Sequence, residues 1–156
     1  MSDLLVLGLG NQLMSDDGIG VVIARRLQRW PMSGVRVVAA GTPGFGLADM
    51  LAAQQRVIFI DAVDAGRAPG SVFWVEPGSI LRDWGRQSLH QVGLADVLSL
   101  MEVVGQMPWV RIIGVQPQRI GAGCSLSGPL RRRLPIITRK AVDMVESSLR
   151  CEISSD

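Results

Sequence analysis

The chain has 156 residues, 47% of them hydrophobic and 19% charged, and this composition is typical of a globular protein rather than a disordered one. The formal net charge of +2 is too small to indicate nucleic-acid binding, because 16 cationic side chains are interspersed with 14 acidic ones. No apolar run approaches the ~18 residues of a membrane span, and Asp3 stands where a signal peptide would carry positive charge, so we expect a cytoplasmic protein with a single domain over residues 1–156.

Five short apolar segments rich in β-branched residues predict strands. In chain order they are residues 4–9, 35–39, 56–60, 71–76 and 109–115. Several of them are apolar on both faces, which is typical of a parallel sheet that helices cover on both sides. Their alternation with helical segments predicts an α/β fold, a three-layer α/β/α sandwich with a twisted, mostly parallel five-stranded sheet.

Apolar residues at three- and four-residue spacing predict helices between and after these strands. In chain order the helices run from Asp16 or Asp17 to Trp30, from Thr42-Pro43 to a point before Arg56, over about 92–104, and over about 136–149. Thr42 can cap the second helix, because threonine is a good cap and proline is tolerated in a first turn. Pro135 is expected to break the last helix, with a short turn before it and the main helix after it.

Acidic and imidazole side chains stand at the boundaries of three predicted elements. Asp16 and Asp17 follow the first strand, Asp61 ends the third strand, and His90 precedes the third helix. Taken singly, each has a structural explanation as a helix cap, a turn former or a partly exposed polar residue. Ligands of parallel α/β sheets bind beyond the carboxyl ends of the strands, so these side chains can meet at one edge. Two carboxylates and one imidazole suit a divalent cation such as zinc, nickel or manganese, with coordination positions left open for a substrate.

The tetrapeptide GLGN at residues 8–11 invites a dinucleotide-binding interpretation, but the spacing contradicts it. The full fingerprint needs a third glycine that opens the helix and an acid about 20 residues later. Glycines 8, 10, 18 and 20 are better explained by a tight turn and close helix packing. The sequence also contains no HExxH and no GxSxG motif, and a serine-protease mechanism would use the single histidine as its base and leave the two acids unexplained.

Five segments of the chain resemble the [NiFe]-hydrogenase maturation endopeptidases. They are GLGNQLMSDDGIG (8–20), GTPG (41–44), VIFIDAVDAG (57–66), HQVGLADVL (90–98) and GVQP (114–117). The resemblance covers nearly the whole length of the chain. It implies an endopeptidase that removes the C-terminal peptide from a [NiFe]-hydrogenase large-subunit precursor after nickel insertion.

The resemblance also implies roles for individual residues. Asp17, Asp61 and His90 would contact nickel and form the catalytic site, while Asp16 would cap or orient the loop. The nickel would arrive with the precursor, bound to its cysteine thiolates, and other divalent cations could take its place in vitro. Whether nickel serves recognition alone or also polarises the scissile carbonyl stays open, with recognition favoured.

The GTPG segment has two compatible explanations. Gly41, Thr42 and Gly44 can form a backbone-rich loop that binds the extended substrate tail, or the segment can be a strand-to-helix turn. Many relatives have an aspartate three residues before this threonine, where this chain has Ala39. The cleavage preference of relatives therefore cannot be copied onto this chain.

Two other protein classes compete with this interpretation. Peptidyl-tRNA hydrolases also begin with a strand followed by GLGN, but they need a tyrosine and an early histidine-asparagine pair. This chain has no tyrosine and no histidine before His90. A non-enzymatic nickel-binding maturation accessory protein could use the same three ligands without cleaving anything, and it is kept as the alternative function.

Three further features bear on partners and compartment. The run from Arg131 to Arg133 is either a solvated helix start or a contact for an acidic protein surface. Cys124 and Cys151 form neither a zinc spacing nor a disulfide framework, which favours a reducing compartment. No heptad pattern or long apolar surface segment indicates a stable oligomer, so we expect a monomer that pairs transiently with its precursor.

Overall fold

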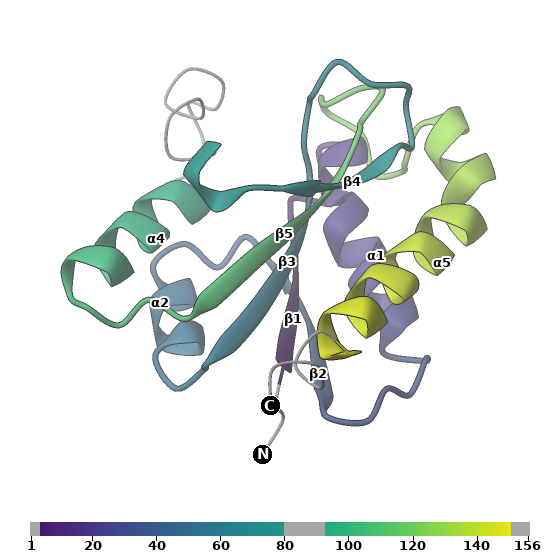
Figure 1. Ribbon diagram of the computed structural model, residues 1–156. Coiled ribbons are helices and arrows are strands. Elements are labelled where there is room, and N and C mark those ends of the chain that lie inside the picture. Colours follow the sequence, from purple (N-terminus) through teal and green to yellow (C-terminus); the bar gives the residue numbers. More distant parts are fainter. Residues whose placement is uncertain (1–3, 80–92, 151–156) are drawn as a thin grey trace.

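The computed structural model describes residues 4–79 and 93–150, and its centre is one five-stranded sheet (Figure 1). The strands are β1 Leu4–Leu9, β2 Val35–Gly41, β3 Arg56–Ala62, β4 Val72–Val75 and β5 Trp109–Val115, in the spatial order β2-β1-β3-β5-β4. All neighbouring pairs are parallel except β4 with β5, which are antiparallel. The predicted five-stranded, mostly parallel sheet is confirmed, and β4 is its antiparallel edge strand.

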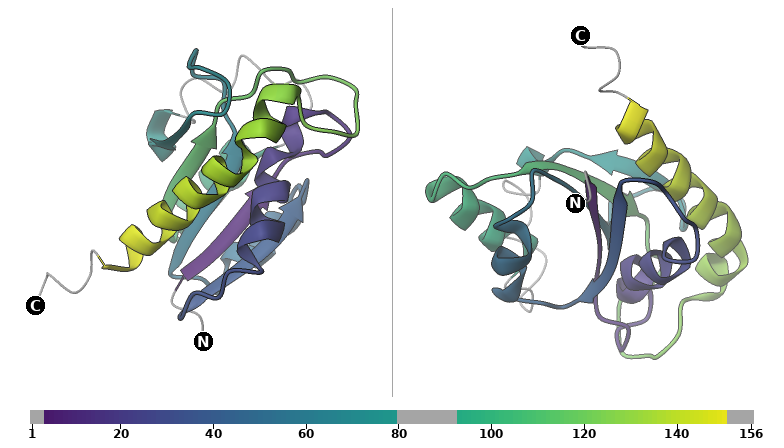
Figure 2. Two further views of the ribbon diagram at one scale, coloured as in Figure 1. Left: turned by 90° about the vertical axis from the view of Figure 1, so that its right-hand side faces the viewer. Right: turned by 90° about the horizontal axis from the view of Figure 1, so that it is seen from below.

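Helices cover both faces of the sheet, as the apolar strands predict (Figures 1 and 2). The 3-10 turn η1 Asp16–Gly18 leads into helix α1 Ile19–Leu27. One face of the sheet is covered by α1 and by α5 Gly128–Arg150, and the other face by α2 Gly46–Leu51 and α4 Leu94–Val103. Alternate residues of β1 pack into the hydrophobic cores on the two faces of the sheet, because successive side chains of a strand point to opposite faces. Leu4 and Val6 pack with α1 and α5, whereas Leu5, Leu7 and Leu9 pack with α2 and α4.

The strand order creates a crevice at the carboxyl ends of β1 and β3. These two strands are neighbours, with Gly8 of β1 opposite Ile60 of β3. From β1 the chain passes through α1 to β2 on one side, and from β3 it continues to β4 and β5 on the other side. Ligands of open α/β sheets bind where the direction of the connections reverses in this way.

Two glycines allow α1 to lie directly against the strands that form this crevice. A Cβ on Gly20 would overlap the carbonyl oxygens of Leu9 and Ile60, and a Cβ on Gly8 would overlap the carbonyl of Gly20. Gly10 has a φ of 126°, a conformation that residues with a side chain rarely adopt. The close packing and tight turn predicted for these glycines are confirmed.

Two helix predictions are wrong. Helix α5 runs without interruption through Pro135, because its buried stripe, which includes Leu130, Ile137 and Ala141, packs as one surface on the sheet and α1. The ring of Pro135 is exposed, so the helix loses a backbone hydrogen bond there but loses no packing. Thr42 does not cap α2, since that helix begins only at Gly46 and has no side-chain cap.

The remaining helix predictions agree with the structure within a few residues. Helix α1 begins at Ile19, after the 3-10 turn that contains the aspartate pair, and ends at Leu27; α4 lies inside the predicted range of 92–104. Arg131, Arg132 and Arg133 are exposed in the first turns of α5, as a solvated helix start would be. Within the described part of the chain, no helix combines the length and the apolar character that crossing a membrane requires.

Candidate functional site

Asp61 is the buried carboxyl group at the centre of the candidate site. It is the second-last residue of β3, its side chain is only 3% exposed, and its Oδ1 accepts a hydrogen bond from the backbone N–H of Ala62 at 2.8 Å. Burial raises the pKa of Asp61 to about 8, and the negative charge of nearby Asp17 adds to the rise against the effect of the Ala62 hydrogen bond. The group is therefore a carboxyl that holds a proton near neutral pH.

Asp17 lies in η1, at the end of the turn that follows β1. Its Oδ2 accepts a hydrogen bond from the backbone N–H of Asn11 at 2.9 Å, and the Asn11 side chain in turn accepts one from Leu13 N–H at 2.9 Å. Asn11 thus holds the loop in the shape that directs the Asp17 carboxylate. The sequence marked Asn11 only as the last residue of GLGN and predicted no role for it.

The structure brings Asp17 and Asp61 together at the β1–β3 crevice, whereas His90 lies outside the described residues. Two like charges beside each other in a buried place are unfavourable unless a cation or a proton offsets one of them. Carboxylate oxygens suit a divalent cation, so the pair fits such a group. In the ranges 4–79 and 93–150, no three histidine, cysteine or acidic side chains form a metal site.

Asp16 faces a different part of the molecule from its neighbour. Its two oxygens accept backbone hydrogen bonds from Gln118 at 2.9 Å, Arg119 at 3.0 Å and Ser127 at 2.7 Å, all in the connection between β5 and α5. Burial alone would raise the pKa of Asp16, but the hydrogen bonds from Ser127, Arg119 and Gln118 lower it overall. Asp16 therefore orients a loop, although that loop is more than 100 residues away along the chain.

The turn that carries the two aspartates is strained and firmly held. Ser15 is the one non-glycine residue with positive φ within the described ranges, at 55°, and its hydroxyl donates to the carbonyl of Ser125 at 3.0 Å. Backbone bridges join Met14 with Gly123 and Ser15 with Ile120. Backbone strain of this kind persists only where the surrounding contacts over-determine it. The β5–α5 connection supplies those contacts.

Gln116 holds a second loop at the same edge of the sheet. Its Oε1 accepts hydrogen bonds from the backbone N–H groups of Ala65 at 2.8 Å and Arg67 at 3.1 Å, and its Nε2 donates to Asp64 at 2.9 Å. Gln116 is only 5% exposed. The sequence marked GVQP as a motif without assigning this residue a role, because its partners lie about 50 positions away.

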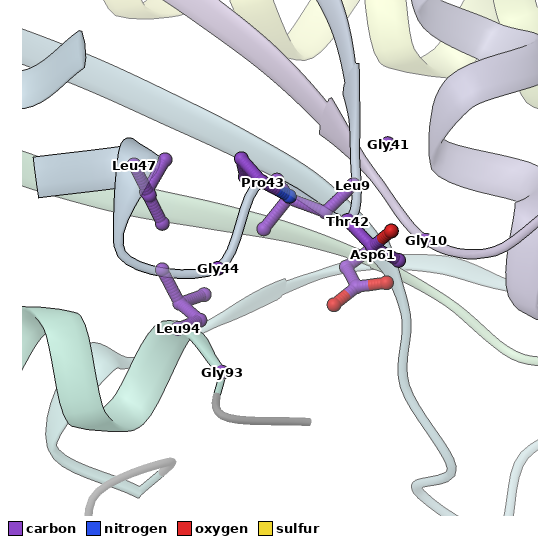
Figure 3. A pocket seen from close by; sticks show the side chains of 10 residues that line it. All are labelled: Leu9, Gly10, Gly41, Thr42, Pro43, Gly44, Leu47, Asp61, Gly93 and Leu94. Atoms are coloured by element: carbon purple, nitrogen blue, oxygen red, sulfur yellow. The ribbon is translucent and has the colours of Figure 1, made fainter. Parts of the chain in front are cut away.

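A pocket of about 220 Å³ opens beside Asp61 (Figure 3). Gly41, Thr42 and Gly44, the three residues predicted to bind substrate, all line it together with Asp61. Ala39 is not among its described lining residues and instead pairs with Gly8 inside the sheet. Among the described lining residues, the only polar side chains are those of Asp61 and Thr42, so the pocket combines an apolar body with one ionisable group.

Comparison with known proteins places the chain among hydrogenase processing proteins. A family model described as hydrogenase maturation protease (HycI) matches residues 21–145. The chain is 38% identical over 150 residues to the hydrogenase expression/formation protein HoxM of Azotobacter vinelandii, covering 92% of this chain and 72% of that protein. It is 36% identical over 128 residues to the hydrogenase 2 maturation protease of Escherichia coli, covering 75% of this chain and 74% of that protein.

A solved structure shows the same fold. The hydrogenase maturating endopeptidase HybD of Escherichia coli superposes with a TM-score of 0.79 at 28% identity, and the match covers 93% of each chain. The described arrangement of sheet and helices is therefore shared over almost the whole length.

Proposed function

The chain belongs to the hydrogenase maturation protease family, and from this premise we propose that it is the endopeptidase that removes the C-terminal peptide from a [NiFe]-hydrogenase large-subunit precursor. The observation that carries the proposal is the electrostatically coupled pair Asp17 and Asp61 at the β1–β3 crevice, next to a pocket of about 220 Å³. This is the place where the fold class binds its ligands.

In this proposal, nickel is the part of the substrate that the enzyme recognises. Asp17, Asp61 and His90 contact the nickel ion that the precursor carries, and cleavage follows only when nickel has been inserted. Two oxygens and one imidazole form an incomplete coordination shell, as suits an ion that is still bound to precursor thiolates. Other divalent cations could occupy the same ligands in vitro.

In this proposal, the proton on Asp61 makes binding depend on nickel. A carboxyl with a pKa of about 8 is largely protonated at pH 7, and a carboxyl must lose its proton to bind a cation. Docking of a nickel-free precursor leaves that proton in place, whereas docking of the nickel-loaded precursor displaces it. Bound nickel can also polarise the scissile carbonyl as a Lewis acid, which is the second role that we propose for it.

In this proposal, the GTPG loop binds the polypeptide chain of the substrate. Gly41 and Gly44 both have positive φ, and apart from each glycine and its two chain neighbours no atom lies within 4 Å of the place where a Cβ would stand. An extended peptide can therefore approach the loop backbone closely. We propose that Gly41, Thr42 and Gly44 bind the precursor tail and that the enzyme acts as a monomer.

The test is cleavage of nickel-loaded precursor by three variants, followed by mass spectrometry of the released peptide. We expect Asp17→Asn, Asp61→Asn and His90→Ala to fold and to lose cleavage, while the control Asp49→Asn, an exposed acid on α2, cleaves as the wild type does. Normal cleavage by all three variants would refute the assignment.

A second measurement separates a protease from a nickel-binding accessory protein. We expect the free enzyme to bind nickel weakly in a calorimetric titration and to cleave loaded precursor but not nickel-free precursor. Tight nickel binding by the free protein without any cleavage would favour the accessory role.

A further inference from the structure

The pocket beside Asp61 has the volume of one large side chain. It is partly open to solvent, and its volume is about 220 Å³. A cavity of about 150 Å³ accommodates benzene, whereas sites for drug-sized ligands need about 300–1,000 Å³. The pocket is therefore too small for a folded segment of a partner and large enough for a leucine, methionine or phenylalanine side chain.

The walls of the pocket are apolar and come from four separate segments. Leu9 lies at the end of β1, Pro43 in the GTPG loop, Leu47 in α2 and Leu94 at the start of α4. In Figure 3, Leu47 and Asp61 stand at opposite sides of the view, with Pro43 between them and Leu94 below Leu47. No lysine or arginine is among the described lining residues, so an acidic occupant would lose its hydration without gaining a cationic partner from them.

The core holds these walls in place. Leu9, Leu47 and Leu94 are 6%, 2% and 3% exposed, and all three belong to the hydrophobic cluster between the sheet and the α2–α4 layer. The backbone N–H of Gly10 donates to the carbonyl of Gly41 at 2.9 Å, which joins the β1 end to the GTPG loop. The pocket is thus preformed, and an occupant would not have to order it.

We propose that this pocket is the subsite for an apolar side chain on a precursor residue that directly flanks the scissile bond. The inference rests on the proposed function, because Asp61 both lines the pocket and belongs to the site for the nickel-bearing substrate. A side chain seated between Leu47 and Leu94 places its own backbone beside the GTPG loop and next to Asp61. Pocket size then determines which residue is accepted at the cut.

The first arm of the experiment varies the substrate and uses the wild-type enzyme. Each of the two residues that flank the cut in the nickel-loaded precursor is changed in turn to glycine, alanine, leucine, phenylalanine and aspartate. At one of the two positions we expect kcat/KM to be at least about 100-fold higher for leucine than for glycine or aspartate, since each methylene in a fitted apolar pocket contributes about 10–200-fold.

The second arm varies the pocket. Leu94→Ala enlarges it and is expected to shift the preference at that position from leucine towards phenylalanine, while Leu47→Phe reduces it and is expected to shift the preference towards alanine. Leu100→Ala is the matched control, because Leu100 lies on the same helix as Leu94 but is 43% exposed and does not line the pocket. Circular dichroism and thermal melting show which variants fold.

The outcomes separate this inference from the proposed function. Wild-type cleavage with kcat/KM values within threefold for all substitutions at both positions would overturn the subsite, while the endopeptidase assignment would stand. Folded Leu94→Ala and Leu47→Phe variants with the wild-type preference would also overturn it. If both variants fail to fold, the wild-type series alone decides. A wild-type enzyme that cleaves no nickel-loaded precursor would instead remove the proposed function, and the subsite with it.

Discussion

Replacement of Asp61 by asparagine should stabilise the metal-free protein at alkaline pH. The pKa of Asp61 is about 8 in the folded protein, against 3.8 for an exposed carboxyl, so the folded state keeps a proton that the unfolded state releases. The contribution of the Asp61 proton to the free energy of unfolding is therefore fully present below about pH 4. It falls as the pH rises towards 8, and no further loss follows above that value. A difference of about four pKa units, at about 1.4 kcal/mol each, sets a ceiling of about 6 kcal/mol on this loss.

The asparagine variant removes the titration but keeps the local geometry. Its Oδ1 can still accept the hydrogen bond from Ala62 N–H, and it carries no charge next to Asp17. Urea unfolding of chelator-treated protein from pH 4 to pH 9 measures the effect. We expect the wild type to lose at least about 2 kcal/mol across this range relative to Asp61→Asn, with the exposed-acid variant Asp49→Asn following the wild type.

Parallel stability curves for the wild type and Asp61→Asn would refute the reasoning, because they would show that Asp61 titrates alike in the folded and unfolded states. Added nickel supplies a second check. It should stabilise the wild type more than Asp61→Asn, since a bound cation offsets the charge that destabilises the folded protein at alkaline pH.

Three further predictions concern the stability of the fold. Gly20→Ala should lower the free energy of unfolding by about 3 kcal/mol, because the new Cβ overlaps two strand carbonyls. The control Gly46→Ala, at an open helical position, should not lower it, and urea unfolding measures both variants. Asp16→Asn should cost about 3 kcal/mol at pH 7, because an amide cannot accept all three backbone hydrogen bonds. The wild-type advantage should begin to shrink as the pH falls below about 4, where the unfolded carboxyl is protonated, and should be lost once the pH passes the lowered pKa of the folded Asp16. Pro135→Ala should raise stability by about 1–3 kcal/mol in thermal melts, since it restores a helix hydrogen bond at an exposed position.

Each of these has an outcome that would contradict it. A Gly20→Ala protein as stable as Gly46→Ala would show that α1 can move off the strands at no cost. An Asp16→Asn protein with the acid sensitivity of the wild type would show that this carboxylate does not hold the β5–α5 connection. A less stable Pro135→Ala protein would show that the ring makes a favourable contact on the helix surface.

Sequence patterns predicted the elements well where the cause of structure is local. The apolar segments 4–9 and 109–115 coincide with β1 and β5, and the helix predicted from Asp16 or Asp17 begins as a 3-10 turn at Asp16 and continues as α1 from Ile19. The prediction failed at Pro135 and at Thr42. Local propensity favoured a helix break at the proline, but the packing of the long apolar stripe of α5 outweighs it. The threonine was expected to cap a helix that instead begins four residues later.

For the candidate site, the sequence by itself determined that acids follow the ends of parallel strands, because the carboxyl ends of such strands share one edge. The family resemblance implied different roles for the two adjacent acids, but only the tertiary structure decided which groups each of them contacts. Asp17 is coupled to Asp61 across the crevice, while Asp16 binds backbone groups beyond residue 117 and Gln116 holds the loop around residue 65. These contacts join positions about 40 to 110 residues apart, whereas periodicity and turn chemistry depend on residues only a few positions apart.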